Sequence, residues 1–158
     1  MLIVLTGGTG LIGKALGQRL TEAGHQVHLL TRRPEKAKNK IPWPCEVFQW
    51  NALSNSLPKE AVPEQKEKWG VINLAGESIF HWPWRKSVKK TIYQSRITGT
   101  KNLVQSLSQL SHPPDFFINA SAIGIYGETE ITAEKESPPD SPLFLQTVCK
   151  DWEKETLK

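Results

Sequence analysis

The 158-residue sequence predicts an α/β fold, a doubly wound parallel sheet with helices on both faces. Three observations predict it. A short apolar run, LIVLT at residues 2–6, is followed by glycines at 7, 10 and 13 and then by an apolar stripe at helical spacing. A second apolar run at 26–31 completes a strand, turn, helix, strand unit of about thirty residues. Strand-like and helix-like segments continue to alternate after it, as they do around parallel sheets.

Each element has a local reason. The continuous apolar run at 2–6 is typical of a parallel strand that is buried on both faces. Apolar residues then recur at helical spacing from Leu11, and the stripe stops at Ala23-Gly24, where glycine is a helix stop signal. Further elements are expected as strands at 26–31, 46–50, 70–76 and 115–124, a long helix over roughly 85–110, and a last helix in the segment that begins at 141.

Composition limits the class of protein. With 38% hydrophobic and 23% charged residues, the chain has the profile of one soluble globular domain. Its net charge of +4 is spread along the sequence, and the densest part, RKSVKK at 85–90, is typical of a solvated helix face, so a nucleic-acid partner is not expected. Neither a signal peptide nor a membrane span is expected, because no apolar run is long enough.

The two cysteines, Cys45 and Cys149, stand far apart and belong to no CxxC or histidine-rich pattern. Neither a metal site nor a disulfide is therefore expected. Free thiols of this kind are typical of a reducing cytosol, which predicts a cytoplasmic protein.

The glycine-rich turn predicts a phosphate site. Gly7 permits a tight turn, Gly10 lets the backbone approach a pyrophosphate, and Gly13 lets the helix pack close to the strand. The amino end of the helix then offers free N–H groups and a partial positive charge to an anion. A purely structural turn is the alternative.

Three motifs, TGGTGLIG at 6–13, NLAG at 73–76 and SAIGIYG at 121–127, resemble in order and spacing those of the extended short-chain dehydrogenase/reductase superfamily. The longer strings NLAGESI, QSRITGT and SAIGIYG resemble its atypical, sugar-nucleotide epimerase-like members, often called epimerase-family proteins. The resemblance covers essentially the whole chain and implies a Rossmann-type fold with a nicotinamide cofactor across the carboxyl ends of the strands.

The resemblance also implies particular contacts. By matching motif positions, the residues beside the pyrophosphate are Gly7, Gly10, Leu11, Ile12 and Gly13. The segment that passes beneath the cofactor is Asn73, Leu74, Ala75 and Gly76, and Ser121 begins the strand end that faces the nicotinamide. Members of the group also carry a carboxyl-terminal substrate domain. Because the sequence ends within a helical pattern, we expect residues 1–158 to be the dinucleotide-binding domain of a truncated chain.

Charge at the end of the second strand predicts NADP(H) as the cofactor. NAD-specific folds place Asp or Glu there to bind the ribose 2′-hydroxyl. Here the sequence has Thr31, Arg32 and Arg33, and a guanidinium can pair with a 2′-phosphate. Two solvated arginines are the alternative. Asn51 follows the third strand, where a polar side chain often meets the adenine, although it fits a solvent-facing turn equally well.

The superfamily's catalytic Tyr-x-x-x-Lys pair and serine have no match. Their positions fall on Leu145, Cys149 and Ala122. A one-residue slip brings Lys150 to the lysine position but puts Gln146 at the tyrosine position. Without the lysine, a phenol with a pKa near 10 is a poor acid or base at neutral pH. The usual proton relay is therefore absent from this chain.

No catalytic residue is assigned, and the remaining candidates are Ser121, Glu77 and Tyr126. Glu77 follows NLAG directly and fits either a carboxylate near the cofactor or a helix-capping or solvated residue. Tyr126 has Glu130 instead of Lys four residues on, and it also fits packing at the strand end. Trp82 and Trp84 fit either an aromatic lid or packing against a further domain. The sequence thus predicts the NADP(H)-binding domain of an atypical reductase or epimerase-like protein that transfers a hydride to or from a small molecule. A non-catalytic dinucleotide sensor is the alternative.

Overall fold

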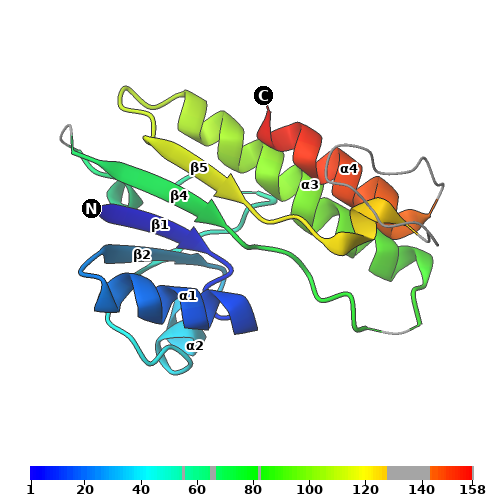
Figure 1. Cartoon of the computed structure of the whole chain (residues 1–158), viewed down its shortest axis with the longest axis horizontal. Helices are drawn as coiled ribbons and strands as arrows, with labels where there is room; N and C mark the ends of the chain where they lie inside the picture. The colour runs from blue at the N-terminus through cyan, green and yellow to red at the C-terminus, as the bar shows by residue number, and fades with distance from the viewer. Residues whose placement is uncertain (55, 65–66, 82, 128–142, 158) are drawn as a thin grey trace.

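A computed structural model describes residues 1–54, 56–64, 67–81, 83–127 and 143–157. It contains one sheet of five parallel strands in the order β3-β2-β1-β4-β5 (Figure 1). The strands are β1 (Leu2–Thr6), β2 (Gln26–Thr31), β3 (Glu46–Gln49), β4 (Trp69–Asn73) and β5 (Phe116–Asn119). The chain runs outward from β1 to β3 on one side and from β4 to β5 on the other. The order therefore reverses between β1 and β4, which is where ligands bind in open α/β sheets.

Helices cover both faces of the sheet, as predicted (Figure 1). They are α1 (Leu11–Glu22), α2 (Pro34–Lys38), α3 (Lys86–Ser108) and α4 (Phe144–Thr156), with short 3₁₀ turns η1 (Lys59–Ala61) and η2 (Ile123–Tyr126). Alternate residues of β1 enter different cores: Val4 packs with Leu103 of α3, and Leu5 lies in the core beside α1 and α2. This alternation explains why the first strand is apolar at every position.

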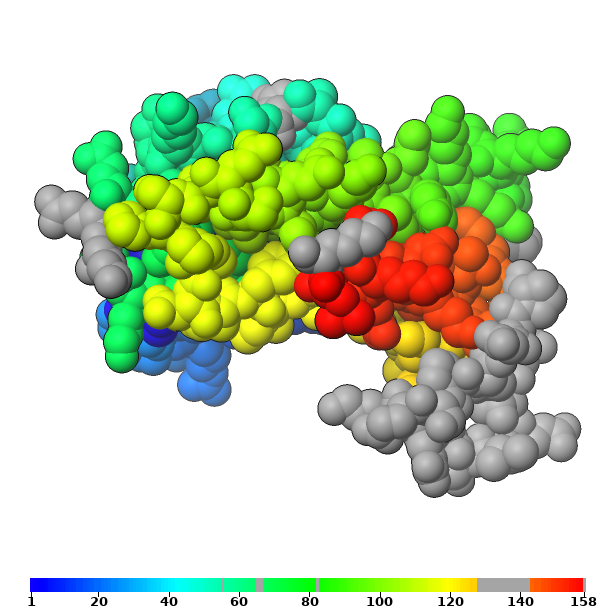
Figure 2. Space-filling model, turned by 90° about the horizontal axis from the view of Figure 1, so that it is seen from above, coloured from blue at the N-terminus to red at the C-terminus, as the bar shows by residue number. Residues whose placement is uncertain are grey.

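Helix α4 lies beside α3 on the outer surface (Figure 2). Ile97 of α3 packs there against Val148 and Trp152 of α4, all three being buried. The apolar contacts of α4 among the described residues therefore run mainly to α3.

The fourth and fifth strands both end several residues earlier than predicted, and the end of the fourth explains the end of the fifth. The fourth strand ends at Asn73 and not at residue 76. The Leu74 amide is shared between the Thr6 carbonyl and hydroxyl, at 3.3 and 3.2 Å, and the Ala75 amide turns to the hydroxyl, at 3.1 Å. The last ladder bond to β5 joins Ala120 N–H to the Asn73 carbonyl. The prediction that the fifth strand continues to residue 124 is therefore wrong, since it has no neighbouring backbone to pair with beyond residue 120.

Helix α2 was not predicted, although its signal is present. Pro34 is its first residue, a position where the missing N–H of proline costs nothing. The helix is only five residues long, which is too short for an apolar period to show in the sequence.

Candidate dinucleotide-binding site

The glycine turn has the geometry that the sequence predicts at its first and third glycines. Gly7 has a φ of +68°, and a Cβ there would lie 2.5 Å from the Leu74 carbonyl oxygen. A Cβ on Gly13 would overlap the carbonyl oxygen of Gly7. Gly10 differs from both: a Cβ there would meet only that same oxygen, at 3.3 Å. Gly7 and Gly13 are thus needed for the turn itself, whereas the space beside Gly10 is open to a ligand.

The turn leads directly into the amino end of α1. Gly10 is the N-cap, has no side chain to cap the helix, and accepts the first helical bond from Lys14 N–H at 3.0 Å. The N–H groups of residues 11 to 13 have no carbonyl partner within the helix and are therefore available to bind an anion. The side chains of Leu11 and Ile12 are 90% and 70% exposed, so only their backbone amides could meet a pyrophosphate.

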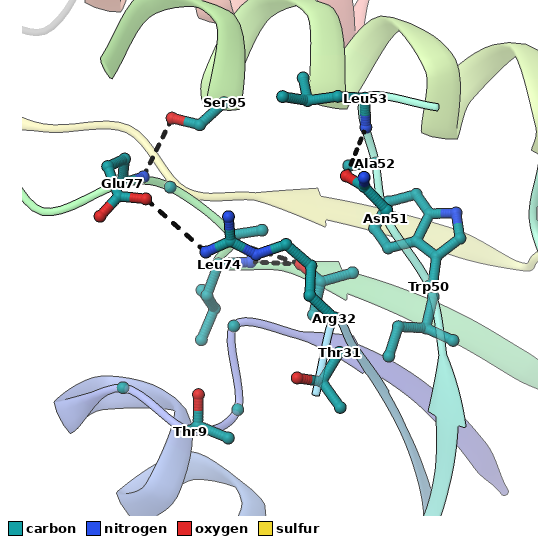
Figure 3. A pocket seen from close by; sticks show the side chains of 17 residues that line it. Thr9, Thr31, Arg32, Trp50, Asn51, Ala52, Leu53, Leu74, Glu77 and Ser95 are labelled. Carbon is teal, nitrogen blue, oxygen red and sulfur yellow. Dashed lines mark hydrogen bonds and ion pairs between the residues drawn. The ribbon is translucent and has the colours of Figure 1, made fainter. Parts of the chain in front are cut away.

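A pocket opens at the carboxyl ends of β1, β2 and β4, beside this turn (Figure 3). Its wall includes residues from the loop after β3 and from α3. Seven of the eleven predicted cofactor-binding residues line it: Gly7, Gly10, Arg32, Asn51, Leu74, Ala75 and Gly76. Three further residues that line the pocket were not predicted: Thr9, Leu53 and Ser95. Each is a common residue type outside the predicted site positions, so nothing in a single sequence indicates that it faces a ligand.

The remaining predicted residues lie around this pocket. Leu11, Ile12 and Gly13 follow the turn as the first residues of α1. Arg33 is exposed and caps α2, with its N–H donating to Thr31 Oγ1 at 3.3 Å. Of the two arginines, it is therefore Arg32 that lines the pocket.

Arg32 and Glu77 face one another across the pocket mouth (Figure 3). Arg32 Nη2 lies 3.6 Å from Glu77 Oε2, and the side chains are 69% and 30% exposed. Both main-chain groups of Glu77 are held by α3: its N–H donates to Ser95 Oγ at 2.9 Å, and its carbonyl accepts from Arg96 Nη1 at 2.9 Å. The main chain of Glu77 is thus held at the pocket edge, with its carboxylate beside Arg32.

Asn51 makes the local turn that the sequence offered as one of its two roles, and it also lines the pocket. Its Oδ1 accepts a hydrogen bond from Leu53 N–H at 3.1 Å, which makes a local turn, and both residues line the pocket (Figure 3). The Asn51 side-chain nitrogen has no protein partner among the residues described, and it is the donor that an adenine would meet.

Asn73 supports the site from below. It is 2% exposed, and its amide bonds Thr6 Oγ1, Thr100 Oγ1 and Asn119 Oδ1, at 2.5, 3.0 and 2.6 Å. These bonds tie β1, β4, β5 and α3 together at the level where the pocket begins. Asn73 therefore holds the pocket floor and does not itself line the pocket.

The positions of the missing catalytic pair lie beside the end of β5. Leu145 and Cys149 both face Gly124 of η2, since a Cβ there would lie 3.3 Å from Leu145 Cβ and 3.6 Å from Cys149 Sγ. Cys149 is 4% exposed, and burial raises the pKa of its thiol. Glu153 raises this pKa further, whereas Arg96 and the amide of Ala122 oppose the shift. The Cys149 thiol is therefore buried, with a pKa above its ordinary value.

The other two catalytic candidates do not line the pocket. Ser121 is exposed, and its hydroxyl donates to Glu153 Oε1 at 2.5 Å. Tyr126 lies in η2, which packs on α4, in agreement with a packing role. Glu130, at its i+4 position, lies outside the described residues. Glu77 is therefore the candidate that the fold brings to the pocket.

The tryptophan pair is only partly described, because Trp82 lies outside the described residues. Trp84 donates its indole N–H to the Ile79 carbonyl at 2.8 Å and stands edge-on to Phe144, with ring centroids 5.8 Å apart. Trp84 therefore packs against the start of α4.

Within the described ranges, no group of three or more His, Cys, Asp or Glu residues is placed to hold a metal ion. A search of the same residues for a helix with the length and apolar character of a membrane span also found none.

A 3-2-1-4-5 parallel sheet with a glycine turn and a helix amino end at its switch point defines a Rossmann-type, nucleotide-binding class of domain. Residues 3–148 match the model of the NAD dependent epimerase/dehydratase family. The chain belongs to that family.

Named relatives support this assignment. The chain is 36% identical to the epimerase family protein YfhF of Bacillus subtilis, over 98% of this chain and 49% of the relative. It is 32% identical to the chloroplastic SDR39U1 homolog of Arabidopsis thaliana, over 100% and 45%. The chain thus spans about half the length of the curated relatives it matches.

Solved structures agree. Human epimerase family protein SDR39U1 (isoform 2), solved with NADPH, superposes with a TM-score of 0.77 at 26% identity, over 98% of this chain and 48% of that one. MoeE5, solved with UDP-glucose and NAD, has a TM-score of 0.78 at 18% identity, over 99% and 48%, a likeness of fold alone.

Proposed function

We propose that this domain binds NADP(H) and serves hydride transfer to or from a carbonyl or alcohol carbon in an atypical, short-chain dehydrogenase/reductase-type oxidoreductase or epimerase. The observation that carries the proposal is Arg32, a guanidinium at the end of β2 on the pocket wall. NAD-specific folds have a carboxylate at this point, which would repel a 2′-phosphate. The human relative solved with NADPH supports the same choice.

The residues present fit such a cofactor. The glycine turn and the amides at the start of α1 would hold the pyrophosphate, Arg32 the 2′-phosphate, and Asn51 the adenine side. Leu74, Ala75 and Gly76 form the wall along the other half of the pocket. When bound, the nicotinamide would donate or accept the hydride, while the chain's own groups bind and orient it.

The decisive experiment is a parallel titration of the purified chain with NADPH and NADH, followed by protein fluorescence. Tighter binding of NADPH by at least about tenfold is expected, because only NADPH offers a phosphate to Arg32. Equal binding of the two, or binding of neither, would contradict the proposal.

A non-catalytic dinucleotide sensor is the second candidate. It is favoured by one observation: Leu145 and Cys149 stand where the superfamily has its tyrosine and lysine, and the Cys149 thiol is buried. Neither side chain can relay a proton near neutral pH. Stopped-flow absorbance of NADPH with a panel of carbonyl compounds, on the full-length protein, separates the two. Substrate-dependent oxidation favours the enzyme, and binding without oxidation across the panel favours the sensor.

We further propose a cytoplasmic location and a small-molecule substrate, with no nucleic-acid or membrane partner. Cys45 and Cys149 are free thiols, which suits a reducing compartment. The net charge of +4 is dispersed along the chain, and a nucleic-acid site would need it gathered on one face.

A further inference from the structure

Arg96 of α3 is a half-buried cation next to the pocket wall. It follows Ser95, which lines the pocket, and precedes Ile97, which enters the core with α4. Arg96 Nη1 donates to the carbonyls of Glu77 and Ile92, at 2.9 and 3.3 Å. Its guanidinium carbon lies 5.3 Å from the centre of the Trp152 ring. Contacts on two sides thus hold the guanidinium in one place.

Gly76 lines the pocket, and this guanidinium packs against it from the side of α3. A Cβ at residue 76 would lie 2.9 Å from Arg96 Cζ and 3.0 Å from Nη2, so only glycine leaves room for the guanidinium at this part of the wall. Nη2 and Nε of Arg96 make no hydrogen bond within the described part of the chain. Their N–H groups are donors without an acceptor, and they lie against a residue that lines the pocket.

The charge of Arg96 is also not balanced by a direct ion pair among the described residues. Glu77 gives it a carbonyl oxygen and directs its carboxylate to Arg32 and His81, at 3.6 and 3.8 Å. Burial lowers the pKa of Arg96, but a guanidinium stays protonated in proteins. A fixed cation that is partly removed from water and has spare donors is typical of a ligand site.

We propose that Arg96 anchors the nicotinamide half of the cofactor, donating from its guanidinium to the hydroxyl oxygens of that ribose. This inference rests on the proposed binding of NADP(H). Cys149, which has no charge to offer a ribose, stands where the superfamily that this chain resembles has its lysine. Arg96 comes from α3, on the β4 side of the glycine turn, whereas Arg32 lies at the β2 side. The cofactor thus meets one guanidinium at each end. Arg96 is a positioning residue and transfers no proton in the reaction.

The test compares a whole cofactor with half of one. NADPH carries both halves, and 2′,5′-ADP carries only the adenosine half with its 2′-phosphate. In the full chain, Arg96→Met is expected to weaken NADPH binding by at least about tenfold and to leave 2′,5′-ADP binding within about twofold. Arg32→Ala is expected to weaken both ligands. Lys101→Met, which removes an exposed cation from the same helix, is the matched control and should change neither.

Arg96→Lys separates the charge from the packing. It loses the planar shape that packs on Trp152 but keeps the cation. Because the cation is kept, we expect it to bind NADPH much more tightly than Arg96→Met does. If it loses as much as Arg96→Met, or if Arg96→Met weakens both ligands equally or neither, the anchoring role is wrong. Should Arg96→Met fail to fold on a thermal melt, the two ligands are compared in Arg96→Lys: a small loss for NADPH with none for 2′,5′-ADP supports the role, and no loss or an equal loss for both contradicts it. A wild-type chain that binds neither ligand would overturn the proposed function itself, so the two failures are distinguishable.

Discussion

Arg32 and Glu77 form an ion pair across the mouth of the pocket, with Nη2 and Oε2 3.6 Å apart. The two residues come from different sides of the glycine turn, one following β2 and the other following β4. Because Arg32 is 69% exposed, the pair is screened by water and is worth little by itself, about 1 kcal/mol or less. A 2′-phosphate can therefore draw Arg32 away from Glu77 at a small cost.

Removal of Arg32 is expected to lower the affinity for NADP(H) selectively. Arg32→Ala should weaken NADPH binding by about 1.5 kcal/mol, roughly tenfold, and NADH binding by less than twofold, because only NADPH carries the phosphate. Fluorescence titration of both cofactors measures this, with Arg33→Ala as the matched control. Equal losses for NADPH and NADH would remove the basis of the cofactor assignment.

Removal of the Glu77 charge is expected to act in the opposite direction. Glu77→Gln keeps the main-chain bonds to Ser95 and Arg96 but frees Arg32 from its carboxylate partner. NADPH should bind about two- to fivefold more tightly, and the gain should shrink as salt screens the charges. A weaker affinity for NADPH would mean that the carboxylate itself contacts the cofactor.

The glycines of the turn are expected to separate binding from folding. At Gly10 the φ is −78° and a Cβ would meet only the Gly7 carbonyl oxygen, at 3.3 Å, so Gly10→Val should abolish NADPH binding with little loss of stability. Gly13→Val should instead unfold or strongly destabilise the chain, because its Cβ overlaps the Gly7 backbone. Thermal melts and NADPH titrations of both variants check this. A Gly10→Val protein that binds NADPH normally would show that the pyrophosphate lies elsewhere.

The Thr6 hydroxyl is expected to contribute strongly to stability. It donates to Asn73 Oδ1 and accepts from the amides of Leu74 and Ala75, and Thr6 is 1% exposed. Thr6→Val leaves Asn73 Oδ1 and the Ala75 amide without that partner, while the Leu74 amide keeps its bond to the Thr6 carbonyl. The change should cost about 2 to 3 kcal/mol of unfolding free energy. Denaturant unfolding measures it. Thr91→Val, at an exposed position of α3, is the control and should stay within about 0.5 kcal/mol.

Cys149 is expected to affect stability at alkaline pH and not cofactor binding. Its pKa is raised in the folded chain, because burial favours the neutral thiol. The resulting stability is fully present below the unfolded pKa of about 8.5, and it is lost as pH rises through the folded pKa. Cys149→Ala should therefore show a smaller fall in unfolding free energy between pH 8 and 10. NADPH binding and any turnover at pH 7 should be unchanged. A full-length Cys149→Ala protein that binds NADPH but loses all turnover would make the thiol a participant.

The sequence by itself determined the first βαβ unit and the turn within it. A five-residue apolar run, a helical stripe that ends at Ala23-Gly24 and glycines at 7 and 13 are local signals. Each depends only on the backbone conformation or the burial of the residue that carries it. Most of the predicted residues that line the pocket follow from this unit and from the NLAG motif.

Only the tertiary structure decided where strands end and which charges meet. Strand β4 ends before residue 75 because a hydroxyl 69 positions earlier takes the Ala75 amide, and no local pattern encodes such a bond. Which of two adjacent arginines reaches the pocket depends on the turn into α2. Arg96 reaches the pocket wall only because α3 packs against the NLAG segment, at a glycine twenty positions earlier. A single sequence gives the periods of its elements, whereas contacts between distant residues arise from the packing of those elements.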